Sequence, residues 1–189
     1  MKRVLWCTAI AVPATAADVA SKEWASSRLA GGRDVTMPGG LIRLQLVINH
    51  GASLGLGAGY EPLLAAAAFA GTILFAAWAV RAAGWAERVG AALAMAGAAG
   101  NLIDRLTRPP GVLHGGVVDW LHVWFYGPTF NLADIWLRGG VLIAASGWLW
   151  HRRTRDHLPP PLAGGPSEMT SPAAPASESH AVQWGLRPR

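Results

Sequence analysis

Two aspartates, Asp119 and Asp134, lie beside strongly apolar sequence in the stretch from Val117 to Arg138. Ionisable groups are energetically expensive in an apolar setting, and proteins that keep them there commonly use them. Two carboxylates held close together cannot both ionise easily, so one keeps a proton while the other acts as a base. Such a pair can hydrolyse a peptide bond without a metal or cofactor. The ionised acid activates a water molecule, and the protonated acid polarises the scissile carbonyl.

Asp104 is a third candidate acid. Asn101, Asp104 and Arg105 stand at helical i, i+3 and i+4 spacing, so an amide, a carboxylate and a guanidinium project from one helix face. Such a cluster is either a boundary where polar side chains reach toward water or a hydrogen-bond network. The residues alone therefore leave three acids, from which two must be chosen.

A second polar face is predicted around Asp134. Asn131, Asp134 and Arg138 stand at i, i+3 and i+7 of an apolar helix. Asn131 is a good candidate for the N-cap of that helix. Arg138 is one turn deeper than Asp134 and could pair with it, which would favour the ionised acid.

Three further polar residues fall where chain segments end. Asp18 and Lys22 are four residues apart on an expected helix, and spacing alone favours an ordinary surface ion pair. Asn49 follows a predicted strand and precedes a glycine-rich turn. Its amide can face a site from there, or it can be a plain turn asparagine.

Other catalytic sets are poorly represented. Ser53 and His50 are weak candidates for a serine peptidase, and there is no HExxH motif for a metal. We expect His50, His114 and His122 to be solvated loop residues, and we expect no metal and no cofactor. The single cysteine, Cys7, excludes an internal disulfide.

The composition favours a membrane protein of one domain. The 189 residues are 52% hydrophobic and 14% charged, and ten of them are Trp. Soluble domains are roughly 25% charged, and indole rings favour the membrane–water interface. The formal charge of +5 could suggest nucleic acid. However, the Arg residues sit beside apolar runs, so membrane lipids are the expected contact and no nucleic acid is expected.

Four apolar segments predict membrane helices at about residues 4–20, 63–80, 88–104 and 130–150, with loops 22–62 and 105–129 between them. The first segment resembles a cleavable signal peptide, but three more apolar segments follow it, so we interpret it as a helix. Together these segments form a membrane domain, 1–155. Residues 156–189 are rich in Pro, Ala and Ser and are predicted to be a disordered cytoplasmic tail.

The segments between the helices should hold the site. Residues 41–49 look like a strand, and pairing with Val117 and Val118 is plausible. Asp119 is expected on the aromatic loop that follows. Four spans put both termini on one side, and the denser Lys and Arg residues there predict that this side is cytoplasmic. The candidate site residues would then gather at the extracytoplasmic face.

The chain resembles the lipoprotein signal peptidases (signal peptidase II) over about residues 4–150. Each matching block is weak alone, but five in this order on four helices are specific. The blocks are Asp18-Val-Ala-Ser-Lys22, Asn49-His-Gly-Ala-Ser-Leu-Gly55, Gly100-Asn-Leu-Ile-Asp-Arg105, Val117-Val-Asp119-Trp120 and Phe130-Asn-Leu-Ala-Asp134. Leu54 departs from the pattern, because an aromatic residue is common at its position.

The resemblance implies an all-α membrane protein with four transmembrane helices. A small extracytoplasmic β-sheet (cradle) and a loop or amphipathic flap would cover the site. It implies that Asp119 and Asp134 are the catalytic pair of an aspartic endopeptidase and that Asp104 is structural. It further implies residues that shape the site and hold substrate: Asp18, Lys22, Asn49, Asn101, Arg105 and Asn131.

The resemblance also implies the substrate and the location. The family's substrate is a prolipoprotein whose cysteine already carries diacylglycerol, cut on the N-terminal side of that cysteine, and its inhibitor class is the cyclic peptide globomycin. The expected location is the bacterial inner membrane, and the expected state is a monomer. The alternative function is a small proton-coupled membrane transporter, which would spread its acids through the depth of the bundle.

Overall fold

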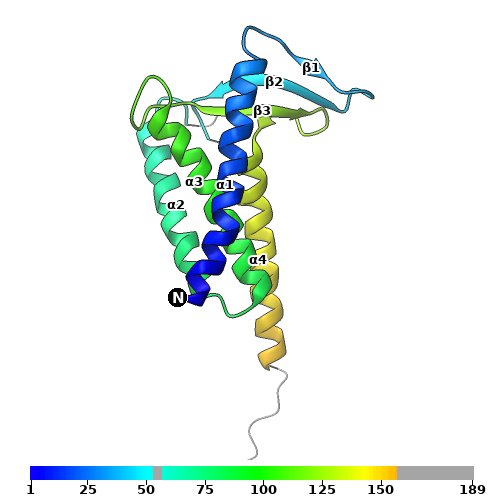
Figure 1. The fold of residues 1–189 in the computed structure, drawn as a ribbon. Helices are drawn as coiled ribbons and strands as arrows, with labels where there is room; N and C mark the ends of the chain where they lie inside the picture. The colour runs from blue at the N-terminus through cyan, green and yellow to red at the C-terminus, as the bar shows by residue number, and fades with distance from the viewer. Residues whose placement is uncertain (53–56, 157–189) are drawn as a thin grey trace, which may run out of the picture. The chain divides into compact units, whose positions relative to one another are not determined.

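In a computed structural model, four helices stand side by side and a four-stranded antiparallel sheet lies across one end of them (Figure 1). The structure describes residues 1–52 and 57–156, which belong to one compact unit, Met1–His157. The elements follow in the order α1 (Lys2–Arg28), β1 (Val35–Thr36), β2 (Ile42–Asn49), α2 (Glu61–Arg81), α3 (Trp85–Thr107), β3 (Val117–Val123), β4 (Thr129–Phe130) and α4 (Leu132–Asp156). Ser53, Leu54 and the tail beyond Asp156 lie outside the described residues.

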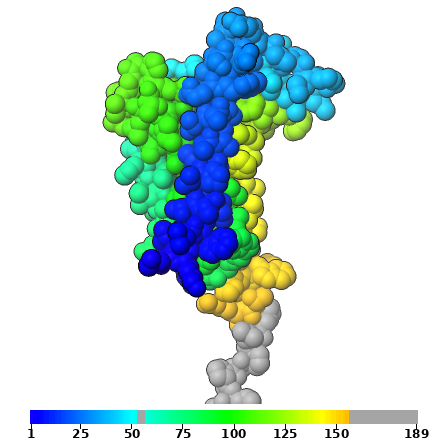
Figure 2. Space-filling view, in the orientation of Figure 1, coloured from blue at the N-terminus to red at the C-terminus, as the bar shows by residue number. Residues whose placement is uncertain are grey.

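The connections between the helices build the sheet. The link from α1 to α2 supplies β1 and β2, and the link from α3 to α4 supplies β3 and β4, in the order β1-β2-β3-β4. The chain's N-terminus lies at the opposite end of the helices (Figure 1). In Figure 2, α1 (blue) runs along the visible face, and the strands near its C-terminal end (cyan) project beyond it. The two long connections, from α1 to α2 and from α3 to α4, thus lie at one end of the helices.

Three of the helices, α1, α2 and α4, are long and apolar enough to cross a membrane. Among the described residues α3 does not meet that measure, so the predicted count of four transmembrane helices is not confirmed. Glu87 and Arg88 near its start and Asp104 and Arg105 near its end reduce its apolar length. Nevertheless α3 is the central helix, because it packs against each of the other three.

Small residues bring α3 and α4 into close contact. A methyl group added at Gly90 or Gly97 would overlap the backbone of α4. One added at Gly140 would lie 2.5 Å from the backbone nitrogen of Ala94. Helices that approach this closely gain dispersion contacts, which are a main source of helix association in lipid. The same packing sets the position of Asp134 relative to α3.

The helices extend beyond the predicted apolar ranges. α1 continues to Arg28 rather than ending near residue 20, α3 spans Trp85–Thr107, and α4 continues to Asp156 past Trp150. Hydropathy marks the apolar run, whereas a helix ends only where its backbone hydrogen bonding ends. Residues 22–28 are therefore helical instead of part of the predicted loop. Phe130 belongs to β4, and α4 begins two positions later.

The sheet carries Asp119 to the bundle. β2 pairs with β3 so that Asn49 faces Val117, Ile48 faces Val118 and Val47 faces Asp119, which confirms the predicted pairing. Buried Val118 packs against Ala25 and Leu29, which anchors the sheet on the end of α1. Asp119 is 2% exposed within β3. Its predicted location on an aromatic loop was wrong, since the strand extends through His122 to Val123.

Candidate active site

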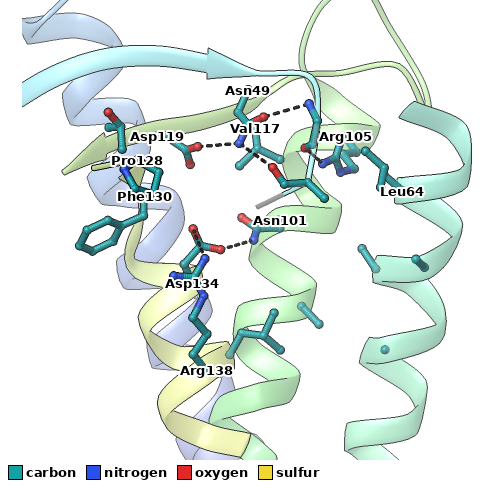
Figure 3. A pocket seen from close by; sticks show the side chains of 18 of the residues that line it. Asn49, Leu64, Asn101, Arg105, Val117, Asp119, Pro128, Phe130, Asp134 and Arg138 are labelled. Carbon is teal, nitrogen blue, oxygen red and sulfur yellow. Dashed lines mark hydrogen bonds and ion pairs between the residues drawn. The ribbon is translucent and has the colours of Figure 1, made fainter. Parts of the chain in front are cut away.

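Asp119 and Asp134 border the same cavity, which has a volume of about 440 Å³ (Figure 3). Asp119 enters it from β3, and Asp134 enters it from the first turn of α4. Asn101 and Arg105 of α3 line the cavity as well. The wall supplied by α2 is apolar and consists of Leu64, Ala67, Ala68, Gly71 and Phe75. A polar end and an apolar side therefore meet at the two acids.

Two asparagine amides hold Asp119. Asn49 donates from Nδ2 to Oδ2 of Asp119 at 2.9 Å, and Asn131 donates from Nδ2 to Oδ1 at 2.7 Å. The orientation of each amide is fixed elsewhere, because Asn49 Oδ1 accepts from the Gly51 N–H and Asn131 Oδ1 accepts from the Asp134 N–H. Both oxygens of the Asp119 carboxylate thus receive an amide donor.

Asn131 joins the two acids. It caps α4 through the backbone N–H of Asp134, at 3.0 Å, and is completely buried. This confirms the predicted N-cap. Because the same side chain also donates to Asp119, the position of the β3 carboxylate is tied to the first turn of α4. Sequence spacing predicted the cap but gave no sign of this second bond.

Asn101 connects Asp134 to a buried cation. Its Nδ2 donates to Asp134 Oδ1 at 3.3 Å, and its Oδ1 accepts from Lys22 Nζ at 3.0 Å. Lysine is a donor only. It therefore orients the amide so that the NH₂ group faces the carboxylate of Asp134.

Lys22 lies in a fully buried charge cluster. It is 0% exposed and pairs with Asp18 at 2.7 Å and with Asp104 at 2.9 Å. The expectation of a solvated surface pair for Asp18 and Lys22 was wrong, because both residues are 0% exposed and Asp104 of α3 also pairs with Lys22. Asp104 also accepts from Arg108 at 2.6 Å and from the backbone N–H of Val118 at 3.2 Å. It thereby links α3 to β3, one residue before Asp119.

Burial raises the pKa of Asp119 to about 6. Desolvation is the largest cause, since it disfavours the charged carboxylate. The negative charge of Asp134 raises the pKa further, whereas the amide donors of Asn49 and Asn131 and the charge of Lys22 oppose the rise. A carboxyl group with this pKa can hold or release a proton near neutral pH, as acid–base catalysis requires.

Arg105 and Arg138 border the cavity from two sides. Arg105 is 5% exposed and donates from Nη2 to the carbonyl of Gly51 at 2.7 Å. Its Nη1 is buried without a hydrogen-bond partner among residues 1–52 and 57–156. Arg138 Nη2 lies 3.8 Å from Asp134 Oδ2, which confirms the predicted pairing, and Nη1 donates to the hydroxyl of Tyr126.

Sequence reasoning gave no individual role to Gly100, and it expected His122 and His50 to be solvated loop residues. Gly100 precedes Asn101, and a methyl group there would overlap Asp18 Oδ2. A side chain at this position would displace the buried acid. His122 lies in β3 and is half-buried rather than in a solvated loop. His50 is exposed, as expected, and the Ser53 proposed as its partner lies outside the described residues.

The fold and the site define a helical membrane protein with a paired-carboxylate site at one end of its bundle. A profile of the family Signal peptidase (SPase) II matches residues 10–149. The chain therefore belongs to the signal peptidase II family, and it is a peptidase and a bacterial membrane protein.

Relatives and solved structures agree with the assignment to this family. The chain is 38% identical over 180 residues to a lipoprotein signal peptidase of Bifidobacterium adolescentis, covering 93% of this chain and 95% of the relative. It is 34% identical over 145 residues to the lipoprotein signal peptidase of Mycobacterium avium, covering 75% and 78%. A bacterial membrane enzyme solved by the in meso method superposes with a TM-score of 0.64 at 26% identity, covering 76% of this chain and 92% of that chain. Another at 24% identity has a TM-score of 0.70, covering 82% and 94%, and supports the fold.

Proposed function

We propose that this chain is an aspartic endopeptidase that removes the signal peptide from lipid-modified prolipoproteins, with Asp119 and Asp134 as its catalytic pair. The observation that carries the proposal is that both carboxylates border one cavity, while the side chain of Asn131 links the Asp119 carboxylate to the backbone N–H of Asp134. The names of the relatives, lipoprotein signal peptidases, support prolipoproteins as the substrate class.

In the proposed reaction the ionised acid takes a proton from a water molecule, and the water oxygen attacks the scissile carbonyl carbon. The protonated acid donates to the carbonyl oxygen, where negative charge develops. As the intermediate collapses and the C–N bond breaks, the leaving nitrogen receives the proton that the water gave up. The re-forming carbonyl returns its proton to the acid that donated it, which restores the starting state of the pair. The cut falls on the N-terminal side of the cysteine that carries diacylglycerol. The pKa of about 6 for Asp119 supports a proton shared within the pair near neutral pH.

The neighbouring residues have supporting roles in the proposal. Asn49, Asn101 and Asn131 orient the carboxylates through their NH₂ groups, and Asp18 and Lys22 hold α1 against α3 and α4. Arg105 offers its unpaired Nη1 to a substrate carbonyl. The apolar wall of α2 faces the acids and suits the apolar part of a signal peptide. Asp104 is structural, because it binds Lys22, Arg108 and the β3 backbone.

The proposed location is the bacterial cytoplasmic membrane, with both termini in the cytoplasm and the site at the extracytoplasmic face. α3 is proposed as the fourth crossing, since it is central among three apolar helices. Basic residues flank the helices at the end away from the sheet, which favours a cytoplasmic location for that end. A cysteine placed at Thr36 in a Cys7→Ser background should react with an impermeant maleimide in intact spheroplasts. Labelling only after lysis would show the opposite orientation, with the sheet on the cytoplasmic side.

The proposed enzyme acts as a monomer, since a single chain supplies both carboxylates and the whole set of proposed site residues. Globomycin is proposed to bind in the cavity, so it should raise the apparent KM for prolipoprotein without changing kcat. Inhibition that substrate cannot relieve would place the antibiotic outside the cavity.

The catalytic pair is tested with purified enzyme and a diacylglyceryl-modified prolipoprotein. Asp119→Asn and Asp134→Asn should each abolish cleavage, whereas Asp34→Asn is a matched control on an exposed aspartate of the β1 region. Undiminished cleavage by Asp119→Asn or by Asp134→Asn, with the control active, would refute the assignment of the catalytic pair.

A further inference from the structure

A second cavity, of about 330 Å³, adjoins the one that holds the two acids. Four residues line both cavities and so form the partition between them: Tyr126, Phe130, Asp134 and Arg138. The remaining walls of the second cavity are apolar and consist of Val123, Phe125, Ile135 and Gly139. We call this second cavity the lateral groove.

The lateral groove opens on a surface that hydrocarbon would cover. One of its sides is α4, which is long and apolar enough to cross a membrane. Ile135 of that helix is 40% exposed, and Phe125 from the turn between β3 and β4 is 74% exposed. Exposed apolar side chains along a membrane helix are in their preferred solvent when lipid chains lie against them. The groove is thus shaped for an alkyl chain rather than for a polar peptide segment.

Arg138 supplies the polar head of the groove. Its guanidinium lies 5.7 Å from the centroid of the Tyr126 ring and donates to the Tyr126 hydroxyl, and it lies 3.8 Å from Asp134 Oδ2. The Arg138 side chain is 43% exposed. Guanidinium has five N–H donors and no acceptor. A fixed donor at the end of an apolar groove fits a ligand with a carbonyl acceptor followed by an alkyl chain.

We propose that the lateral groove and Arg138 bind the diacylglyceryl group of the substrate. One acyl chain lies in the groove, and Arg138 donates to the carbonyl oxygen of the ester that attaches it. The inference rests on the proposed function, because it needs a lipid-bearing cysteine next to the scissile bond. Arg138 is one helical turn from Asp134, a rise of about 6 Å, so a group only a few bonds from the reacting carbonyl reaches it.

The hydrogen bond is tested with two substrates that differ only in the linkage of their lipid chains. One prolipoprotein carries a diacylglyceryl group, and the other carries a dialkylglyceryl group, whose ethers lack the carbonyl. A hydrogen bond to a charged donor predicts that kcat/KM is about 10- to 100-fold higher for the diester. Arg138→Met should remove this preference, and Arg138→Lys, which keeps a charged donor, should retain part of it.

The ratio of the two rates separates this role from a structural one. Damage to the fold or to Asp134 lowers both rates together, because both substrates share the scissile bond. Equal rates for the wild-type enzyme, or an unchanged ratio in Arg138→Met, would refute the role of Arg138. Failure of the wild type to cleave either substrate would instead refute the proposed function.

The groove itself is tested by filling it. A methyl group at Gly139 would meet nothing within 4 Å, so Gly139→Phe can extend into the groove without disturbing the helix packing. We expect it to lower kcat/KM at least tenfold for a dipalmitoyl substrate while sparing a diacetyl substrate. Leu142→Phe, at a 69% exposed position of α4 outside the groove, is the matched control. Equal effects on both chain lengths, or no effect, would mean that the acyl chain lies elsewhere.

Discussion

The carboxylate of Asp18, on α1, accepts a hydrogen bond from the backbone N–H of Ala133 at the start of α4, at 2.8 Å. The first turn of α4 therefore has two caps, one from its own Asn131 and one from a helix far away in the sequence. Because Asp134 follows Ala133 directly, α1 helps to fix a carboxylate of the site. The oxygen of Asp18 that does not cap α4 pairs with Lys22.

Asp18→Asn should keep the hydrogen bond that caps α4 and remove the negative charge that pairs with Lys22. The amide oxygen can still accept from Ala133, but Lys22 loses one of its two buried acidic partners. Breaking a buried ion pair costs about 3 to 5 kcal/mol; since Asp104 still pairs with Lys22, we expect about 3 kcal/mol, measured by denaturant unfolding in detergent. Asp34→Asn, whose partner Arg43 is 3.9 Å away at the surface, should change stability by less than about 1 kcal/mol. Equal effects of the two substitutions would contradict the burial of the cluster.

Adjacent glycines of α4 should respond in opposite directions. Gly140→Ala places a methyl group 2.5 Å from backbone atoms of α3, whereas Gly139→Ala meets nothing within 4 Å. We expect Gly140→Ala to destabilise the fold by about 1 to 3 kcal/mol or more. Gly139→Ala should stabilise it by up to about 1 kcal/mol through helix propensity. Thermal unfolding midpoints of the two variants check this, and a common direction would argue against the close packing of α3 and α4.

The raised pKa of Asp119 predicts a pH dependence of stability. Burial raises the pKa from 3.8 to about 6 on folding, so the folded state binds more protons between these values. The contribution of Asp119 to the free energy of unfolding is fully present below pH 3.8 and is lost as the pH rises through about 6. The shift corresponds to about 3 kcal/mol.

Asp119→Asn should remove that decline, which unfolding measurements from pH 4 to pH 7 can follow. The wild type and the variant are compared by the slope of the free energy of unfolding against pH. The absolute stability of this variant also falls, because its new NH₂ group faces the NH₂ of Asn49 or Asn131. A wild-type slope retained in the variant would show that another group titrates.

Asn101→Asp should impair catalysis more than folding. The carboxylate can still accept from Lys22, but it can no longer donate to Asp134, and it adds a negative charge beside that acid. We expect kcat to fall at least tenfold while the unfolding midpoint changes little. Asn101→Leu loses both bonds and should reduce stability as well. If Asn101→Asp cleaved at the wild-type rate, the donor to Asp134 would be dispensable.

Truncation after Arg155 should leave cleavage intact, because every proposed site residue lies between Asp18 and Arg138. The measurement is kcat/KM of the truncated and full chains at equal amounts of folded protein. A large loss of activity in an equally abundant truncated enzyme would contradict this expectation.

Local sequence patterns predicted the helices and strands better than the side-chain contacts between them. The uncharged run within α2 and the i, i+3, i+4 spacing at the end of α3 were visible from the sequence. Spacing could not show that Asp104 turns to Lys22 and Arg108 while Asn101 and Arg105 line the cavity. That division depends on which helix packs on each side of α3. For the same reason the burial of Lys22, whose partner Asp104 is distant in sequence, could not be foreseen.

The pairing of β2 with β3 was predictable from the strand-like run before Asn49, but the burial of Asp119 was not. Val118 packs on Ala25 in the last turns of α1 and on Leu29 at its C-cap, both beyond the range that hydropathy marked as helix. The resemblance to signal peptidase II selected Asp119 and Asp134 from three acids. The structure adds how Asn131 joins them.

The three-residue link Ala82–Gly84 ties α2, with a mean hydropathy of 2.1 over its most apolar stretch, to α3, the one long helix of the described residues that is not apolar enough to span by itself. A segment with several charges partitions poorly into lipid when it is presented alone. We therefore expect α2 and α3 to leave the translocon as a hairpin, with α2 supplying the insertion free energy that α3 lacks. Lengthening this link with a flexible insert should yield chains in which α3 remains outside the bilayer, detectable by glycan or maleimide tagging during synthesis.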